Sequence, residues 1–253
     1  MEPRLHISAD TLRQLLPQLG PSLALWRAAE IAALREHDYA RPILDLGCGD
    51  GLVTAHVLPH VEIGVDPYRT ALARAAQRGL YARLIDRPLE TAPLAAGTLG
   101  TIVSNSVLEH VPRPQPLLRA AARLLRPGGR LVFTVPTEAF SHWLMLPAAC
   151  YARWRNRHYE HRNLWPIARW AANLDHAGFT VERVLPYLRQ PLVTAWDALE
   201  LAQRIWIGRQ RLFSLAWHRL PTHALARVAD RIARLDLAAP PPGGGRMIVA
   251  RRR

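Results

Sequence analysis

A glycine-rich loop and two aspartates, each placed just after a short apolar segment, are the residues of this sequence best suited to hold a ligand. The loop is Gly47-Cys48-Gly49-Asp50-Gly51, and the aspartates are Asp66 and Asp86. Glycines permit a tight turn and let a ligand approach the backbone closely. A carboxylate that ends a strand can accept hydrogen bonds from both hydroxyls of a ribose, and a second one can hold an exocyclic amine. These features predict a nucleoside-containing ligand.

The spacing of the loop distinguishes between classes of nucleoside ligand. It reads G-x-G-x-G, whereas the dinucleotide fingerprint is G-x-G-x-x-G. Asp50 would also place a carboxylate where a dinucleotide brings its pyrophosphate, while a methionine tail with a positive sulfonium meets no such repulsion. Each feature also has a purely structural alternative: the glycines could merely close a turn, Asp66 could cap the next helix, and Asp86 could begin a turn.

The positions of these residues follow from the alternation of apolar segments along the chain. Short apolar runs alternate with helical patterns, which predicts βαβ units and a parallel sheet with helices on both faces. The expected strands are 42–46, 61–65, 82–85, 99–104, 130–135, 179–185 and 246–250. The expected helices are 22–37 with Ser22 as its cap, a short one ending at 58, and those over 69–78, 115–126 and 166–177.

Five segments in order resemble the motifs of class I S-adenosylmethionine-dependent methyltransferases, and most closely those of the type 11 or ubiquinone-biosynthesis-like branch. The segments are ILDLGCGDG (43–51), GVDP (64–67), Asp86, SNSVLEHV (104–111) and LLRPGGRLVFTVP (124–136). The resemblance covers about residues 40–137 and returns weakly over 166–188. It implies a Rossmann-like α/β fold with a seven-stranded, mostly parallel sheet and an antiparallel last strand from residues 246–250. A helical insert would precede that strand.

The resemblance also implies how S-adenosylmethionine binds. Asp66 would bind the ribose, Asp86 the adenine amine, and Asn105 would line the pocket near the methionine end. The family often has an apolar residue after the adenine-binding acid; here Arg87-Pro88 follows, so Leu89 is expected to cover the adenine. The residues expected around the methionine moiety are Asp45, Gly47, Gly49 and Gly51.

Candidates for contact with the methyl acceptor lie after the fourth and fifth strands. His110 follows the fourth strand and is a candidate general base, or else it covers the cofactor or packs under a helix. Tyr159 and His161 lie in an arginine-rich segment that forms the acceptor lid in many relatives, or else this is a solvated surface. His158 and His161 lack companion carboxylates or cysteines in a metal pattern, so no metal site is predicted.

The organisation predicted along the chain is a helical cap over 1–40, a methyltransferase domain over 41–190 and 245–253, and a helical insert over 191–240. Within 191–236, a basic amphipathic helix near 222–235 accompanies several tryptophans, a pattern typical of peripheral binding to an anionic membrane surface. The alternatives are that the insert packs on the sheet or forms a dimer face. The large apolar residues before this helix are Trp196, Leu199, Trp206, Phe213, Trp217 and Leu220.

The net charge of +13 is carried by arginine alone, and it is uneven. Residues 1–150 hold 15 Arg and 13 acids (+2), and residues 151–253 hold 18 Arg and 7 acids (+11). The C-terminal third therefore favours an anionic partner, if it has one. The two cysteines make no disulfide framework, which predicts a reducing cytoplasm, with peripheral association at the inner membrane surface left open.

The preferred function is methyl transfer to a small-molecule, lipid or lipid-linked acceptor. The alternatives are a nucleic-acid methyltransferase and a non-catalytic S-adenosylmethionine-binding protein. Nucleic acid is disfavoured because Asn105-Ser106-Val107-Leu108 lacks the Asn/Asp-Pro-Pro-Tyr/Phe loop of amine-directed DNA methylases, and no Pro-Cys nucleophile pair is present. The sequence predicts neither the oligomeric state nor the acceptor atom.

Overall fold

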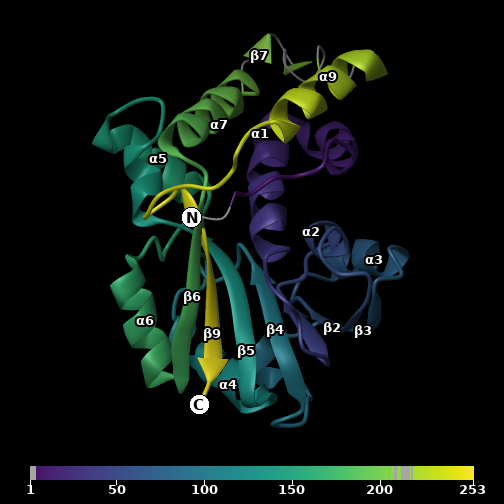
Figure 1. The fold of residues 1–253 in the computed structure, drawn as a ribbon, viewed down its shortest axis with the longest axis vertical. Helices are drawn as coiled ribbons and strands as arrows, with labels where there is room; N and C mark the ends of the chain where they lie inside the picture. The colour runs from purple at the N-terminus through teal and green to yellow at the C-terminus, as the bar shows by residue number, and fades with distance from the viewer. Residues whose placement is uncertain (1–3, 205, 208–209, 212–216, 218) are drawn as a thin grey trace.

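The computed structural model describes residues 4–204, 206–207, 210–211, 217 and 219–253. Its centre is a seven-stranded sheet in the order β3-β2-β1-β4-β5-β9-β6 (Figure 1). The strands are β1 (Ile43–Leu46), β2 (Val61–Val65), β3 (Tyr81–Ile85), β4 (Leu99–Asn105), β5 (Leu125–Pro136), β6 (Phe179–Tyr187) and β9 (Gly245–Arg252).

The strand directions confirm the predicted sheet. The pairs β1–β2, β1–β4, β2–β3 and β4–β5 are parallel, whereas β9 runs antiparallel to both β5 and β6. The last strand thus returns from the end of the chain and inserts between β5 and β6. Because the first five strands run the same way, their carboxyl ends meet at one edge, which is where open α/β sheets bind ligands.

Alternate residues of the strands supply two hydrophobic cores, one on each face of the sheet, as the two-residue period of a strand requires. Val103 and Val132 face the core that holds α1 (Ala9–Leu34). Ile102 and Leu131 face the core that holds α4 (Pro114–Leu124) and α6 (Ile167–His176). The short α2 (Leu52–Ala55) follows β1, and α3 (Arg69–Gln77) follows β2.

The first helix begins earlier than the sequence suggested. Ser8, not Ser22, is the N-cap, and its side chain accepts a hydrogen bond from Thr11 N at 3.2 Å. The early turns pack apolar side chains into the core, which outweighs the helix-breaking signals at residues 17–21. A break occurs at Gly20 (φ 72°, ψ 173°), and beyond it the Ser22 hydroxyl donates to Glu200 Oε1 at 2.5 Å.

The predicted helical insert lies before the last strand, and it contains a short two-stranded sheet as well as helices. It contains α7 (Gln190–Ala202), a two-stranded hairpin of β7 (Trp206–Ile207) and β8 (Gln210–Arg211), and α9 (Thr222–Ala233). Phe213 lies outside the described residues. Figure 1 shows α7 and α9 beyond the carboxyl ends of the parallel strands, together with α5 (Ala149–His158).

Apolar side chains on one face of α9 pack against the protein core. Val228, Ile232 and Leu235 pack against the core that contains α1, and Ala229 is fully buried. Helix α9 thus packs chiefly against α1, which leaves less of its apolar face to meet a membrane. No helix among the described residues combines the length and apolar character needed to cross a bilayer.

A buried ion pair joins α5 to α7. Arg155 Nη2 lies 2.7 Å from Asp197 Oδ1, and both side chains are fully buried. Asp197 Oδ2 also accepts hydrogen bonds from Met145 N at 2.9 Å and Tyr151 OH at 2.7 Å. The guanidinium carbon lies 4.9 Å from the ring centre of Tyr159 and 5.2 Å from that of Trp196. One carboxylate therefore fixes the two helices and the segment just before α5.

Replacing Asp197 is expected to destabilise the protein strongly, because Arg155 would stay buried without its counter-charge. We expect Asp197→Ala to lower the free energy of unfolding by about 3–5 kcal/mol, measured by urea denaturation. Glu182→Ala is the matched control, since Glu182 pairs with Arg130 and Arg251 on the surface, and its cost should stay below about 1 kcal/mol. An equal loss of unfolding free energy in the two variants would contradict this role of the buried ion pair.

Candidate active site

The glycine loop lies between β1 and α2, at the carboxyl edge of the sheet. Its three glycines have positive φ angles of 67°, 55° and 75° at Gly47, Gly49 and Gly51. A Cβ on Gly47 would come 2.4 Å from Val107 Cγ2, so no larger residue fits there. A Cβ on Gly49 would meet no atom within 4 Å and would project into an adjoining cavity.

Asp66 connects the end of β2 to this loop. Its Oδ2 accepts a hydrogen bond from Gly49 N at 2.9 Å, and its Oδ1 accepts one from Tyr68 N at 2.8 Å. The side chain is nearly buried but still lines the cavity. Each carboxylate oxygen keeps a lone pair after these bonds, so Asp66 can still accept from a ligand hydroxyl.

Asp45, the third residue of β1, lies beneath the loop. Thr54 Oγ1 and Tyr81 OH both donate to its Oδ2 at 2.6 Å. Burial raises the pKa of Asp45 to about 6, against the opposing effect of these two hydrogen bonds. The two hydroxyls fix the carboxyl group where it borders the cavity.

The cavity at this edge has a volume of about 880 Å³. It brings together five of the seven residues predicted to bind the cofactor: Asp45, Gly47, Gly49, Asp66 and Asn105. The chemistry of its wall fits S-adenosylmethionine, because carboxylates complement a sulfonium and an ammonium, and the open side of Gly49 leaves room for a ligand.

Two predicted residues lie outside the cavity wall. Gly51 begins α2, where an added Cβ would meet the Tyr81 ring at 2.9 Å. Asp86 is partly exposed, and its Oδ2 pairs with Arg69 Nε at 2.8 Å. Leu89, predicted to cover the adenine, is instead buried in the core beside α4. The reason is local: a short 3-10 turn over Leu89–Thr91 directs Leu89 inward.

Asn105 ends β4 and is held by two partners. Its Nδ2 donates to Glu30 Oε2 at 3.0 Å, and its Oδ1 accepts from Thr134 Oγ1 at 2.8 Å. Glu30 lies on α1 and is completely buried. It also accepts hydrogen bonds from Trp26 Nε1 at 2.8 Å and from Ser106 Oγ at 2.5 Å. No sequence signal pointed to Glu30, because it lies within an apolar helix far from the motifs.

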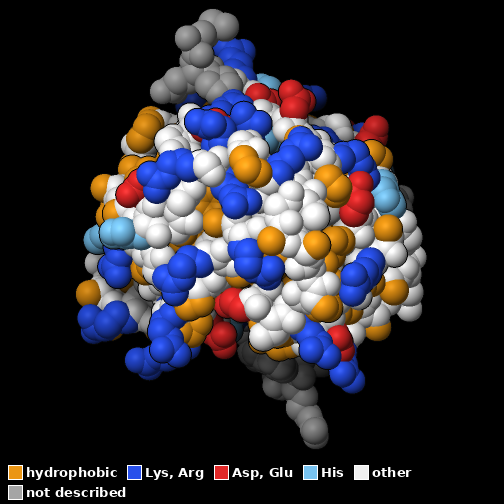
Figure 2. All heavy atoms as spheres, turned by 90° about the horizontal axis from the view of Figure 1, so that it is seen from below, with side chains coloured by type: hydrophobic (Ala, Val, Ile, Leu, Met, Phe, Trp, Pro, Cys, Tyr) orange, Lys and Arg blue, Asp and Glu red, His pale blue; other side chains and the backbone are white. Residues whose placement is uncertain are grey.

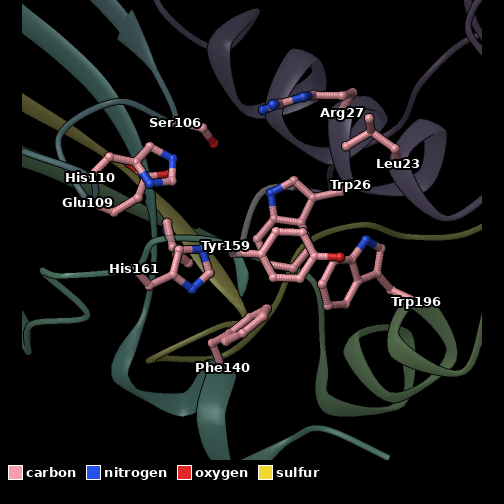
Figure 3. Close-up of a pocket in the computed structure, with 11 residues that line it drawn as sticks. Leu23, Trp26, Arg27, Ser106, Glu109, His110, Phe140, Tyr159, His161 and Trp196 are labelled. Carbon is pink, nitrogen blue, oxygen red and sulfur yellow. The ribbon is translucent and has the colours of Figure 1, made fainter. Parts of the chain in front are cut away.

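A smaller pocket of about 90 Å³ opens beside the large cavity. Leu23, Arg27, Ser106, His110 and Tyr159 line both, so the two spaces share a wall. Figure 3 shows aromatic rings from separate segments of the chain around this inner pocket. The rings that line it are those of Trp26, His110, Phe140, Tyr159, His161 and Trp196.

The three predicted acceptor residues meet at this wall. His110 is about two-fifths exposed, and its ring stacks on that of His161 with centroids 5.9 Å apart. His161 in turn stacks on Tyr159 at 5.7 Å. Tyr159 OH donates to Glu200 Oε2 at 2.5 Å, so this hydroxyl already has a partner. Burial, with the nearby His110 and Arg155, lowers the pKa of His161 to about 3, so its imidazole is neutral at physiological pH.

Glu109 is a site residue that the sequence analysis missed. It precedes His110, is only 2% exposed and lines the inner pocket. Its Oε2 has no hydrogen-bond partner among the described residues. Burial raises the pKa of Glu109 to about 8, and the like charge of Glu30 adds to the effect. A glutamate next to the predicted histidine was visible in the sequence, but its burial was not.

The described residues contain no group of three histidine, cysteine or acidic side chains placed to hold a metal ion. The two spaces are lined by carboxylates, hydroxyls, imidazoles, aromatic rings and the guanidinium of Arg27.

Known proteins share this architecture. One solved neighbour is a possible histamine N-methyltransferase of Thermotoga maritima, with a TM-score of 0.59, 14% identity, and coverage of 96% of this chain and 100% of that one. Another is geranyl diphosphate C-methyltransferase of Streptomyces coelicolor, solved with S-adenosyl-L-homocysteine, with a TM-score of 0.60, 14% identity, and coverage of 92% and 84%. At these identities the likeness concerns the fold.

The chain also resembles an Escherichia coli K12 protein, ubiquinone biosynthesis O-methyltransferase. The two are 29% identical over 114 residues, which cover 42% of this chain and 48% of that relative. The chain thus matches about half the length of such relatives. A family model described as a methyltransferase domain matches residues 8–184, well over half of the sequence. That match includes the glycine loop, the aspartates Asp66 and Asp86, and Glu109 of the inner pocket. It places this chain in the family of S-adenosylmethionine-dependent methyltransferases.

Proposed function

We propose that this chain transfers a methyl group from S-adenosylmethionine to a small-molecule or lipid-linked acceptor, whose reacting group enters the inner pocket. The observation that supports this most is the shared wall between the 880 Å³ cavity and the 90 Å³ pocket. Methyl transfer requires donor and acceptor to be aligned at contact distance, and two adjoining spaces of unequal size satisfy that need.

Within this proposal the cofactor residues have distinct tasks. Asp66 accepts hydrogen bonds from the ribose hydroxyls, while Asp45 and the backbone of Gly47 and Gly49 surround the methionine end. Asn105, fixed between Glu30 and Thr134, closes the cavity toward the inner pocket. The cofactor supplies an activated methyl group on a sulfonium. Gly51 and Asp86 act indirectly, through the turn and the surface beside it.

The acceptor residues contribute shape and orientation. His110 and Tyr159 lie at the border between the two spaces, and His161 lines the inner pocket only. Because His161 stays neutral and the Tyr159 hydroxyl is bonded to Glu200, we assign both a positioning role. Of the three residues, His110 has a side chain that is about two-fifths exposed to solvent.

The distribution of charge favours a small acceptor over nucleic acid. Among the described residues, the two spaces are lined by five carboxylates and one guanidinium: Asp45, Asp50, Asp66, Glu109, Glu160 and Arg27. Figure 2 shows arginine side chains scattered over the opposite face, at the amino ends of the parallel strands. A nucleic-acid substrate would require a basic surface beside the site.

Labelled methyl transfer tests the acceptor class directly. We expect the protein, given S-adenosylmethionine with an isotopic methyl group and a host-cell extract, to place label in the aqueous small-molecule fraction or the organic lipid fraction. Scintillation counting of these two fractions and of precipitated nucleic acid makes the comparison. Label mainly in nucleic acid would overturn the proposal, and no transfer to any fraction would favour a non-catalytic binding protein.

Removing the predicted ribose ligand tests the cofactor site. Asp66→Ala is expected to weaken S-adenosylmethionine binding by about 2 kcal/mol, because charge-assisted hydrogen bonds are lost. Isothermal titration calorimetry measures the change. Asp175→Ala is the control, since Asp175 is an exposed residue of α6 that pairs with Arg253. Unchanged affinity in a folded Asp66→Ala protein would contradict this placement of the cofactor.

A further inference from the structure

We propose that the inner pocket receives the amino group of an amine and that Glu109 accepts its proton, which makes the chain an N-methyltransferase. This inference rests on the proposed function and specifies its acceptor. It is carried by a buried carboxylate oxygen without a partner, by the aromatic rings around it and by the acidic lining of both spaces.

The position of Glu109 is rigidly defined. Its backbone oxygen accepts hydrogen bonds from Arg162 N at 2.8 Å and Asn163 N at 3.1 Å. Asn163 Nδ2 donates to the backbone oxygens of Leu108 at 2.8 Å and Val111 at 2.7 Å. The segment around Glu109 is thus tied on both sides to residues 162–163. Its side chain is held at the pocket wall, with Oε1 3.7 Å from His110 Nε2.

Two buried carboxyl groups near the pocket differ in their partners. Glu30 takes the hydrogen bonds of Trp26, Arg27, Asn105 and Ser106. Glu109 Oε2 takes none from the described residues. An unpaired buried polar atom is costly, and in a native site it calls for a ligand or a chemical role. Because the neighbouring donors already bond to Glu30, a ligand is the natural partner of Glu109.

The chemistry of the pocket favours a cation. The face of a tryptophan ring attracts cations, and Trp26 borders the space. Tyr159 and Trp196 also border it, and the Arg155 guanidinium already lies near each of these two rings. Arg27 is the lining guanidinium, and its Nη1 is bonded to Glu30 Oε2 at 2.5 Å. A carboxylate or phosphate on the reacting end of an acceptor would meet Glu109 without a free counter-charge. An ammonium group meets both the rings and the acid.

The reaction balances with groups that the site and its cofactor provide. An alkylammonium binds beside Glu109, and one N–H proton passes to Oε2. The freed nitrogen lone pair forms the bond to the methyl carbon of the donor, and the carbon–sulfur bond breaks with its electrons staying on sulfur. The products are a methylated amine, a protonated Glu109 and S-adenosylhomocysteine. A base whose pKa lies near the working pH is suited to this transfer.

The charged and titratable groups facing Glu109 come from several elements. They are Glu30 and Arg27 of α1, His110 beside it, His161 across the pocket, and Tyr187 of β6. His161 stays neutral, and burial raises the pKa of Tyr187 far above its ordinary value. The proton exchange that accompanies ligand binding is therefore expected at Glu109.

The raised pKa of Glu109 predicts a pH dependence of stability that needs no substrate. Between its ordinary value of 4.5 and about 8, the folded protein holds a proton that the unfolded chain has lost. Unfolding then releases this proton, so stability falls as pH rises through that window. We expect the free energy of unfolding of the wild type to fall relative to that of Glu109→Gln from pH 5 to 8, measured by urea denaturation. Parallel curves for the two proteins would contradict the prediction.

The decisive experiment measures amine binding and its proton release. With the protein saturated by S-adenosylhomocysteine, benzylamine, phenol and acetate are titrated separately by calorimetry in buffers of different ionisation enthalpy. We expect benzylamine to bind best and to release close to one proton per molecule at pH 7, since Glu109 must ionise to pair with it. Glu109→Gln should bind benzylamine at least tenfold more weakly and release no proton. Glu36→Gln, a surface control, should behave like the wild type.

The outcomes distinguish a failure of the amine assignment from a failure of the proposed methyl-transfer function. Binding of S-adenosylhomocysteine without binding of benzylamine, or tighter binding of phenol or acetate, would overturn the amine assignment alone. Amine binding with proton release that persists in Glu109→Gln would overturn the role of Glu109. A protein that does not bind S-adenosylhomocysteine would overturn the proposed function itself. If Glu109→Gln does not fold, the proton release of the wild type still tests the claim.

Discussion

The Glu30 carboxylate is the contact on which the arrangement of the site depends. It lies on α1, is fully buried, and accepts hydrogen bonds from two residues of its own helix and from Asn105 and Ser106 at the end of β4. A buried acid with so many donors is a strong geometric restraint, because any shift of the helix would leave a charge unpaired. This contact fixes α1 against the point where the cofactor cavity meets the inner pocket.

A second buried charge organises the other side of the pocket. The Arg155–Asp197 pair holds α5 against α7, and the Arg155 guanidinium packs over Tyr159 and Trp196. These two rings line the inner pocket. The site is thus bordered by two buried electrostatic contacts, while the carboxylate of Glu109 between them remains available to a ligand.

The net charge of the chain and the charge of its site have opposite signs. An excess of arginine would suggest an anionic substrate, but the residues lining the two spaces are mostly acidic. A site is defined by its local field, since charges on the outer surface are screened over about 8 Å at physiological ionic strength. The local charge therefore carries more weight for the acceptor than the composition does.

The sequence by itself determined which residues meet at the large cavity. Asp45, Gly47, Gly49, Asp66 and Asn105 belong to strand ends within one continuous stretch, and parallel strands necessarily bring their carboxyl ends to one edge. Local pattern did not determine the direction in which Leu89 points, or the start of α1 at Ala9. Only the tertiary structure decided the acceptor half, because its wall combines α1, the segment after β4, residues near Phe140, the 159–161 segment and α7. Burial of Glu30 and Glu109 arises from contacts between these distant segments, which is why no local pattern could predict it.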